Sequence, residues 1–401
     1  MRVLFLTHRL PYAPNRGDRI RAFHIVRSLA SRVDLELVSL VHDRDELAQV
    51  SRLESMGVRV TAVHVPRLRN LALGALQLAG KRPLTHLLLD APDLSTTIRE
   101  IVAQRPPDVV LAFCSGMARF ALEPPLSEFP LVVDLVDVDS QKWLALSESS
   151  SWPKSWIYER EAEHLAEFER RLAAAASEVF VVNERERKLM RTVAPDSNVA
   201  VVPVGVDVDP LLPRVPPERR PRIVFCGVMN YTPNVDGVRW FARDVWPLVR
   251  ARRPDAQFVI VGSDPVAHVR RLHSPEQGIE VSGTVDDVRP YLWESAVSIA
   301  PLFMARGVQT KVLEAVAAGL PAIVTSAVFE GLPPAIRSAC RVADTAEAYA
   351  AAALSLLNMT PADRRQLAQS ADLSQLGWDA QLRPLHDALA SATPRTQAVA
   401  V

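Results

Sequence analysis

The chain has 401 residues, and its 46 Lys and Arg side chains balance 46 Asp and Glu side chains, so its formal net charge is zero. With 48% hydrophobic and 23% charged residues, its composition is that of a folded globular protein and excludes a mainly disordered chain. The neutral balance argues against a binder of long nucleic acids, which needs excess positive charge. The length predicts two or three domains, at roughly 150 residues each.

Cysteine usage and hydropathy indicate the compartment. Cys114, Cys226 and Cys340 lie far apart and in no metal-binding spacing, so we expect reduced thiols, as in the cytoplasm. No secretory signal follows Met1, and the longest apolar run, 71–80, is half of the ~20 residues that span a bilayer. We expect a cytoplasmic protein that is not integral to a membrane, with peripheral contact at the cytoplasmic face of the inner membrane left open.

In chain order, apolar runs typical of buried parallel strands alternate with helical patterns. In the first half, strands are expected over residues 2–7, 35–40, 58–63, 109–113, 131–135 and 178–182, with helices over 18–31, 95–104 and 159–176. A proline-rich stretch over 203–221 indicates a linker. After it, strands are expected over 222–226, 257–261, 280–282, 297–300 and 322–325, with helices over 235–252, 309–318 and 378–390. This order predicts two doubly wound α/β domains facing a central cleft.

The sharpest motif follows a strand of the second half. A loop carrying Arg306 and Gly307 leads into a helix that begins near Val308, and the free N–H groups of that helix would join Arg306 and Lys311 in an anion site. Lys311 and Glu314 are three residues apart and share one helix face, where they would hold a pyrophosphate and a ribose diol. An ordinary exposed salt bridge is the alternative. Only five basic residues are Lys, which favours a specific use of Lys311.

A family resemblance enters here. The run Leu-Glu-Ala-Val-Ala-Ala-Gly-Leu-Pro at 313–321 resembles the C-terminal signature of retaining GT-B glycosyltransferases of family 4. The resemblance implies that Glu314 binds the ribose hydroxyls of a nucleotide diphosphate sugar. Arg306 stands where the family has its first Glu, which is a departure. The family's diphosphate-binding Arg and Lys are also missing after Gly227, so Lys311, with Arg306, is expected to replace them.

Three runs, at 227–237, 305–315 and 134–143, resemble a narrower subgroup, the bacterial PEP-CTERM/exosortase-associated exopolysaccharide sugar transferases. The resemblance implies a hexosyltransferase-type enzyme that moves a sugar to a glycan or lipid-linked acceptor with retention. Its implied parts are an acceptor-binding domain, a linker, a nucleotide-sugar-binding domain, a helix that crosses back to the N-terminal domain and a flexible tail. These parts would span residues 1–202, 203–221, 222–376, 377–392 and 393–401.

The resemblance also implies further site residues. The donor-binding set beyond Glu314 comprises Gly307, Val308, Gly227, Asn230, Gly283, Thr284 and Val285. The loop after the first strand is expected near the phosphates and the acceptor, and it contributes Arg16, Gly17 and Arg19, with His8 at the strand end. A solvated basic helix start, and a structural role for the histidine, are the alternatives.

Asp137 and Asp139 resemble a DxD metal motif. Because retaining GT-B enzymes generally use basic groups instead, we expect no metal and no other cofactor. Asp137 is expected to face the reacting sugar or the acceptor, which makes the catalytic set Lys311, Arg306 and Asp137. Asp139 is interpreted as a helix N-cap.

Two other functions stay open. One is a sugar-nucleotide epimerase of similar architecture. The other is a non-catalytic sugar-binding or scaffold protein, which is supported by the replacement of the family's first Glu by Arg306. One surface question stays open too. Residues 67–82 have basic ends around an apolar middle, which suits either the surface of an anionic membrane or packing within the N-terminal domain.

Overall fold

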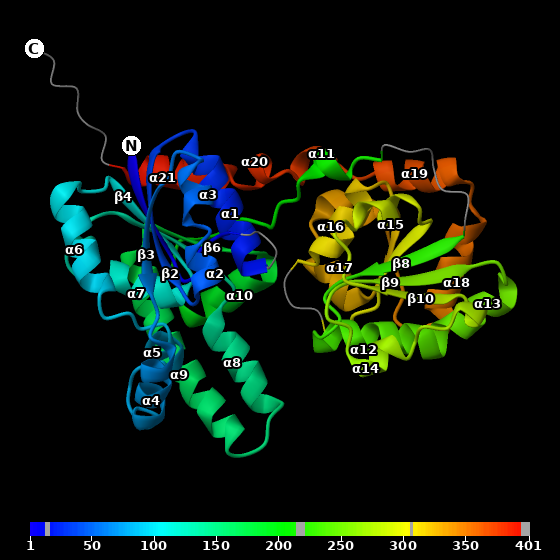
Figure 1. Cartoon of the computed structure of the whole chain (residues 1–401), viewed down its shortest axis with the longest axis horizontal. Coiled ribbons are helices and arrows are strands. Elements are labelled where there is room, and N and C mark those ends of the chain that lie inside the picture. The colour runs from blue at the N-terminus through cyan, green and yellow to red at the C-terminus, as the bar shows by residue number, and fades with distance from the viewer. Residues whose placement is uncertain (13–16, 214–220, 305–307, 394–401) are drawn as a thin grey trace, which may run out of the picture. The chain divides into compact units, whose positions relative to one another are not determined.

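The computed structural model describes residues 1–12, 17–213, 221–304 and 308–393. The chain divides into two compact units (Figure 1). Unit 1 comprises Met1–Pro203 and Leu382–Val401, and unit 2 comprises Val204–Gln381. The expected site residues Arg16, Arg306 and Gly307 lie outside the described residues.

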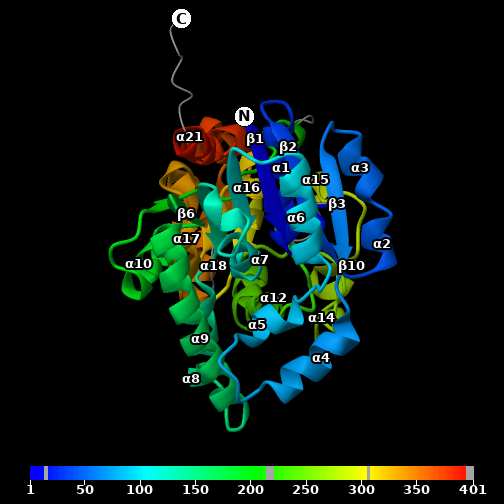
Figure 2. The same ribbon diagram turned by 90° about the vertical axis from the view of Figure 1, so that its left-hand side faces the viewer.

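Unit 1 is built on a sheet of seven parallel strands among its described residues, in the order β3-β2-β1-β4-β5-β6-β7. The strands are β1 (Arg2–Thr7), β2 (Asp34–Val41), β3 (Arg59–His64), β4 (Val109–Phe113), β5 (Leu131–Val136), β6 (Glu178–Val181) and β7 (Val199–Val201). Every residue of β1 and β4 is buried, because helices cover both faces of the sheet (Figure 2). The chain runs outward from β1 to β3, returns to β4 and continues the other way, so the topology switches between β1 and β4.

Twelve described helices and turns surround this sheet. They are α1 (Gly17–Ala30), α2 (Arg44–Leu47), α3 (Val50–Glu54), α4 (Arg67–Leu76), α5 (Leu84–Leu88), α6 (Leu94–Gln104), α7 (Ser115–Ala121), η1 (Leu126–Glu128), α8 (Asp139–Glu148), α9 (Lys154–Ala175), α10 (Glu184–Val193) and α21 (Arg383–Ala392). The last of these comes from the far end of the chain and lies against β4 and β5. Its residues Leu385 and Leu389 are buried, and Ser28 Oγ of α1 and His386 Nε2 lie 2.8 Å apart.

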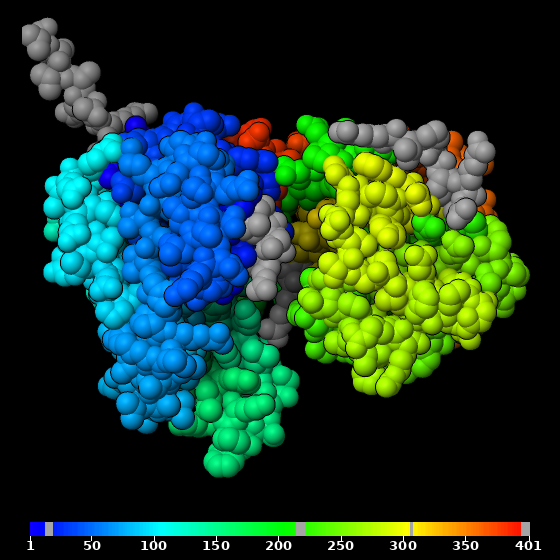
Figure 3. All heavy atoms as spheres, viewed as in Figure 1, coloured from blue at the N-terminus to red at the C-terminus, as the bar shows by residue number. Residues whose placement is uncertain are grey.

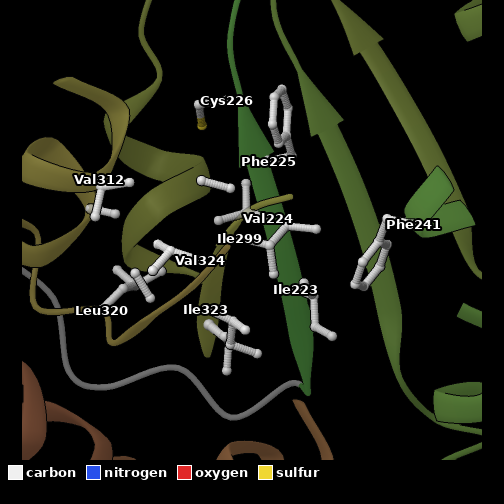
Figure 4. Packing of buried hydrophobic residues seen from close by; sticks show 14 of the residues in the cluster. Ile223, Val224, Phe225, Cys226, Phe241, Ile299, Val312, Leu320, Ile323 and Val324 are labelled. Atoms are coloured by element: carbon white, nitrogen blue, oxygen red, sulfur yellow. The ribbon is translucent and has the colours of Figure 1, made fainter. Parts of the chain in front are cut away.

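Unit 2 has a sheet of six parallel strands in its described part, in the order β10-β9-β8-β11-β12-β13. The strands are β8 (Arg222–Cys226), β9 (Gln257–Val261), β10 (Ile279–Gly283), β11 (Val297–Ala300), β12 (Ala322–Val324) and β13 (Cys340–Val342). Figure 4 shows Phe225 of β8, Ile299 of β11 and Val324 of β12 in the buried core. The topology switches between β8 and β11, which pair directly.

The helices and turns described in unit 2 are α11 (Val208–Leu211), α12 (Thr232–Trp240), η2 (Phe241–Val245), α13 (Trp246–Arg252), α14 (Ala267–Arg270), η3 (Pro275–Gln277), α15 (Arg289–Trp293), α16 (Thr310–Ala317), α17 (Ser326–Gly331), η4 (Pro334–Ala339), α18 (Ala346–Asn358), α19 (Pro361–Gln369), η5 (Leu373–Gln375) and α20 (Trp378–Gln381). The prediction of two doubly wound α/β domains is confirmed.

Three details differ from the sequence prediction. The helix expected over 235–252 contains a π-helical turn, η2, just before Pro247. The helix expected over 378–390 is two segments, α20 and α21, which meet at Leu382 and belong to different units. The edge strands β7 and β13 were not predicted, because three residues carry too little periodicity. No described helix is long and apolar enough to cross a membrane.

Candidate active site

Three turns converge at the carboxyl ends of β8, β9 and β10. The Gly227 N–H donates to the Val261 carbonyl at 3.0 Å, and the Met229 N–H donates to the Ser263 carbonyl at 2.8 Å. The Gly262 N–H donates in turn to the Gly283 carbonyl at 3.2 Å. Backbone groups therefore tie the turns together, at the edge of the sheet where ligands of doubly wound folds bind.

Gly262 allows the closest of these approaches. Its φ is 156°, and a Cβ at this position would come within 1.7 Å of the Gly227 carbonyl oxygen. No side chain fits in that space. Sequence reasoning missed Gly262, because the spacing of residues does not reveal which turns meet in the fold.

Lys311 reaches the turn after β8 from α16. Its Nζ donates to Asn234 Oδ1 at 2.7 Å and lies 4.3 Å from the centroid of the Phe225 ring. A Cβ on Gly227 would be 2.9 Å from this Nζ. The ammonium group thus lies next to Gly227, after which this chain lacks the family's basic residues, and its role in their place stays a prediction.

Burial shifts the pKa of Lys311 and the pKa values of its two titratable neighbours. Burial lowers the pKa of Lys311 to about 8, and the nearby Cys226 and Glu314 oppose that shift. Burial raises the pKa of Glu314 to about 7, opposed by the charge of Lys311. Burial likewise raises the pKa of the Cys226 thiol to about 12, so this thiol stays protonated. The site combines a cation and a carboxylate that both titrate near neutrality.

Lys311 and Glu314 do not form the salt bridge that was the alternative interpretation. Among the described residues, no ion pair with an N–O distance of 4 Å or less joins Lys311 to Glu314. In the same described part of the chain, no hydrogen bond to the Glu314 carboxylate is seen. Both side chains are half-buried, so each keeps some accessible surface for a ligand.

Asn234 is a site residue that sequence reasoning missed. Its side chain is 6% exposed, and its Nδ2 donates to the Val228 carbonyl at 2.8 Å. This bond fixes the amide orientation and turns Oδ1 toward Lys311. Asn234 lies within the run 227–237 that carried the subgroup resemblance, so a signal was present, but its partner is 77 residues away.

The other expected donor residues of unit 2 frame the same edge. Asn230 and Thr284 are exposed, while Val285 and Val308 are half-buried and Val285 packs on the core. Gly283 has a φ of 73°, with open space where a Cβ would stand. Their assignment to the donor stays a prediction.

In unit 1, part of the basic loop expected near the phosphates makes contacts within the protein itself. Gly17 begins α1, and Arg19 donates to Glu46 at 2.5 Å. His8 directly follows β1, is half-buried and stacks on Phe113 with ring centroids 5.9 Å apart. It lies at the topological switch of this sheet, where β1 and β4 are neighbours.

The two aspartates after β5 have different environments. Asp137 is half-buried and follows Val136, whose φ of 68° is unusual for a β-branched residue. The interpretation of Asp139 as an N-cap is wrong. Asp139 is the first residue of α8, and its Oδ2 accepts a hydrogen bond from Ser115 Oγ at 2.7 Å. Burial raises the pKa of Asp139.

In the described part of the chain, no cluster of metal-ligating side chains forms around Asp137 and Asp139. Within the described residues, no group of three or more His, Cys, Asp or Glu side chains is arranged to hold a metal ion. Asp139 instead helps to join α8 to α7 through Ser115.

Comparisons with known proteins connect this geometry to a family. A model of the glycosyl transferase 4-like domain matches residues 17–205, and a model of glycosyl transferases group 1 matches residues 220–359. The chain belongs to the glycosyltransferases of the GT-B fold. The candidate site in unit 2 therefore lies in the group 1 glycosyl transferase domain.

Solved structures agree with the fold over nearly the whole chain. Anabaena HepE in complex with UDP matches with a TM-score of 0.64 at 14% identity, covering 98% of this chain and 100% of HepE. A glycosyltransferase from Rickettsia africae matches with a TM-score of 0.67 at 12% identity, covering 98% and 99%. The trehalose 6-phosphate synthase of Burkholderia multivorans matches at 0.63 and 13%, covering 97% and 98%. No curated protein sequence matches this glycosyltransferase chain.

Proposed function

We propose that this glycosyltransferase moves a sugar from a nucleotide diphosphate sugar to a glycan or lipid-linked acceptor, with retention of the anomeric configuration. The observation that carries the proposal is the pair formed by Lys311 and Glu314. Both are half-buried, and they are not paired with each other within the described residues. They occupy one face of α16 beside the switch between β8 and β11.

Lys311 would stabilise the leaving group. When the bond between the anomeric carbon and the diphosphate oxygen breaks, its electron pair stays on the diphosphate, where negative charge grows. The acceptor hydroxyl forms the new bond to the anomeric carbon, and its proton passes to the departing diphosphate oxygen and from there to solvent. A preorganised ammonium in a partly desolvated site acts on this growing charge. The first N–H groups of α16, which have no acceptors within the helix, would add to this stabilisation.

Glu314 would orient the donor. Its carboxylate accepts no hydrogen bond from the described residues, so both oxygens are available to the two hydroxyls of a ribose. HepE, which shares the fold, has been solved with UDP, with UDP and glucose, and with UDP-glucose. UDP-sugars are therefore the first donors to test.

The finer parts of the proposal rest on the sequence resemblance. Asp137 and His8, each at the carboxyl end of a strand of unit 1, would contribute to the acceptor side. We further propose a cytoplasmic role in exopolysaccharide or other cell-surface polysaccharide synthesis, by an enzyme that needs no metal. The subgroup of PEP-CTERM/exosortase-associated sugar transferases fits the runs around Asn234 and Lys311.

The deciding experiment measures nucleoside diphosphate release from a panel of nucleotide sugars, with and without candidate acceptors. A transferase releases the diphosphate in an acceptor-dependent way, and NMR of the product tests retention at the anomeric carbon. An epimerase would alter the donor without an acceptor. A sugar-binding protein would do neither, yet a donor at 100 times its Kd would stabilise it by about 2.7 kcal/mol. Loss of activity in EDTA, restored by Mg²⁺ or Mn²⁺, would overturn the metal-free proposal and return Asp137 and Asp139 as ligands.

A further inference from the structure

Helix α4 turns its apolar face toward solvent. Leu68, Leu71 and Leu76 are 85%, 51% and 82% exposed, and their spacing places them along one side of the helix. The opposite side buries Asn70 and Gly74, a polar residue and the smallest residue. A helix packed only for the stability of its own domain would bury its leucines and expose its polar side chain.

The outward orientation is fixed by hydrogen bonds. Asn70 is fully buried, and its Nδ2 donates to the carbonyls of Leu88 at 3.2 Å and Asp90 at 2.7 Å. Rotating α4 to bury its leucines would break both bonds and leave a buried amide unsatisfied, which is costly. The exposure of Leu68 and Leu76 is therefore built into the fold.

The long helix α9 holds the chain that follows α4. Arg160 Nη2 donates to the carbonyls of Gly80 and Arg82, the latter at 2.9 Å. The Glu161 carboxylate accepts hydrogen bonds from the N–H groups of Leu84 at 2.6 Å and Thr85 at 2.8 Å. Together with the packing of α8 on α9 and of α4 on α5, these bonds make the four helices one lobe of unit 1, which projects beyond the sheet in Figures 1 and 2.

Two tryptophans extend the apolar surface onto this hairpin. Trp152, in the connection between α8 and α9, is 80% exposed, and Trp156 in the first turn of α9 is 46% exposed. Trp156 is one helical turn before Arg160, on the face of α9 whose Arg160 binds the chain after α4. Figure 3 shows α4 and the α8–α9 hairpin at the outer surface of this lobe.

Exposed cations stand close in sequence to these leucines and tryptophans. Arg67, Lys81, Arg82 and Lys154 are exposed, and no acidic side chain within 4 Å of any of them is seen in the described ranges. Arg69 is neutralised by Asp90 at 3.0 Å. The opposing charges at this end of the hairpin are those of Glu148 and Glu159, both exposed. Four free cations against two carboxylates leave the surface positive.

We propose that this lobe surface docks onto an anionic lipid membrane. The surface consists of Leu68, Leu71, Leu76, Trp152 and Trp156 with the cations Arg67, Lys81, Arg82 and Lys154. Leucines of an amphipathic helix enter the boundary between headgroups and acyl chains, and tryptophan rings favour the headgroup level. Lysine and arginine at the rim attract anionic headgroups. Docking needs no transfer reaction and would hold whether or not the donor site acts as proposed.

Sedimentation with vesicles tests the docking. The full chain is mixed with vesicles of phosphatidylcholine alone, or of phosphatidylcholine with phosphatidylglycerol, and the bound fraction is measured. We expect binding to the anionic vesicles that weakens with salt. The double variant Leu68→Ser, Leu76→Ser should partition about tenfold more weakly, since two large apolar side chains no longer enter the bilayer. Lys81→Gln with Arg82→Gln should weaken binding to anionic vesicles only.

Matched control variants distinguish binding through this surface from nonspecific adsorption to vesicles. Leu47→Ser on α2 and Leu248→Ser on α13 remove exposed leucines elsewhere and should bind as the unaltered chain does. All variants are first compared by circular dichroism and thermal unfolding, which exposed substitutions should leave unchanged. The proposal is overturned if the unaltered chain ignores anionic vesicles, or if the Leu68 and Leu76 variant binds normally. It is overturned equally if these leucines instead drive self-association in sedimentation equilibrium without lipid.

Discussion

The ammonium of Lys311 and the amide oxygen of Asn234 are 2.7 Å apart, and their hydrogen bond joins α16 to α12 above the turn at Gly227. The bond gives the cation a fixed position before any ligand arrives, because the other end of the amide is held by the Val228 carbonyl. Preorganisation of this kind is what makes a charge effective at a transition state. The site predictions below follow from it.

Replacing Lys311 by Ala should lower kcat by about 10²-fold or more, because the charge that forms on the leaving diphosphate loses its counterion. Lys311→Arg keeps the charge on a larger, planar group beside Gly227 and should restore only part of the rate. Steady-state kinetics with the identified donor measure both effects. Lys188→Ala, an exposed lysine on α10, is the control and should be silent. Full activity of Lys311→Ala would refute the assignment of this cation.

Replacing Glu314 by Gln should act chiefly on the donor KM. The ribose hydroxyls change little during the reaction, so the carboxylate contributes nearly equally to the ground state and the transition state. Titration of the nucleoside diphosphate by calorimetry should show the same weakening, independent of turnover. Glu330→Gln, an exposed carboxylate on α17, is the comparison. An unchanged donor affinity in the Glu314 variant would remove Glu314 from the donor site.

The pH dependence of kcat/KM should be bell-shaped and narrow. Activity should fall as the pH drops below about 7, where Glu314 gains a proton, and as it rises above about 8, where Lys311 loses one. Because the two groups interact, the apparent pKa of each limb is a property of the pair and not of one residue alone. Asn234→Asp places a carboxylate next to the ammonium, raises the pKa of Lys311 and should move the alkaline limb to higher pH.

Lys311→Arg serves as the reference for this profile, since a guanidinium stays charged throughout and the alkaline limb should vanish. An alkaline limb that persists in Lys311→Arg would assign it to another group.

Gly262→Ala should destabilise unit 2 strongly, by about 3 kcal/mol or more, because backbone strain and overpacking act together. The added Cβ would lie 1.7 Å from the Gly227 oxygen. Gly283→Ala is the matched control. It has a left-handed φ of 73° but open space, so it should cost only about 1–2 kcal/mol. Urea unfolding followed by a signal from unit 2 measures both, and equal losses would contradict the close approach of the two turns.

The elements that sequence patterns predicted best are buried on both faces. β1, β4, β8 and β9 are continuous apolar runs, and no alternative structure competes for such segments. The ends of helices were harder. At Leu382, two helices of different units follow each other, and Pro384 in the first turn of α21 is the sequence signal for this break that the prediction of one helix overlooked.

The candidate site was predictable where one motif contained it. Lys311 and Glu314 share a helix, so their spacing alone places them on one face. Asn234 gains its role from Lys311, 77 residues away, and Gly262 gains its role from Gly227, 35 residues away, so neither role is visible in a local pattern. Asp139 shows the opposite failure, because a residue type that suits an N-cap is used to bind Ser115 instead.

Unit 1 is built from both ends of the chain, and this has a consequence for its synthesis. The residues that complete it, in α21, leave the ribosome only after all of unit 2 has been made. Until then the faces of β4 and β5 that α21 covers, and the Ser28 hydroxyl that meets His386, have no partner from α21. The C-terminal unit can therefore finish folding before the N-terminal one, against the usual order of domains. A nascent chain that ends before Arg383 would contain all of unit 2 and a unit 1 that still lacks α21, so the folding of unit 1 is completed only when this helix docks on β4 and β5.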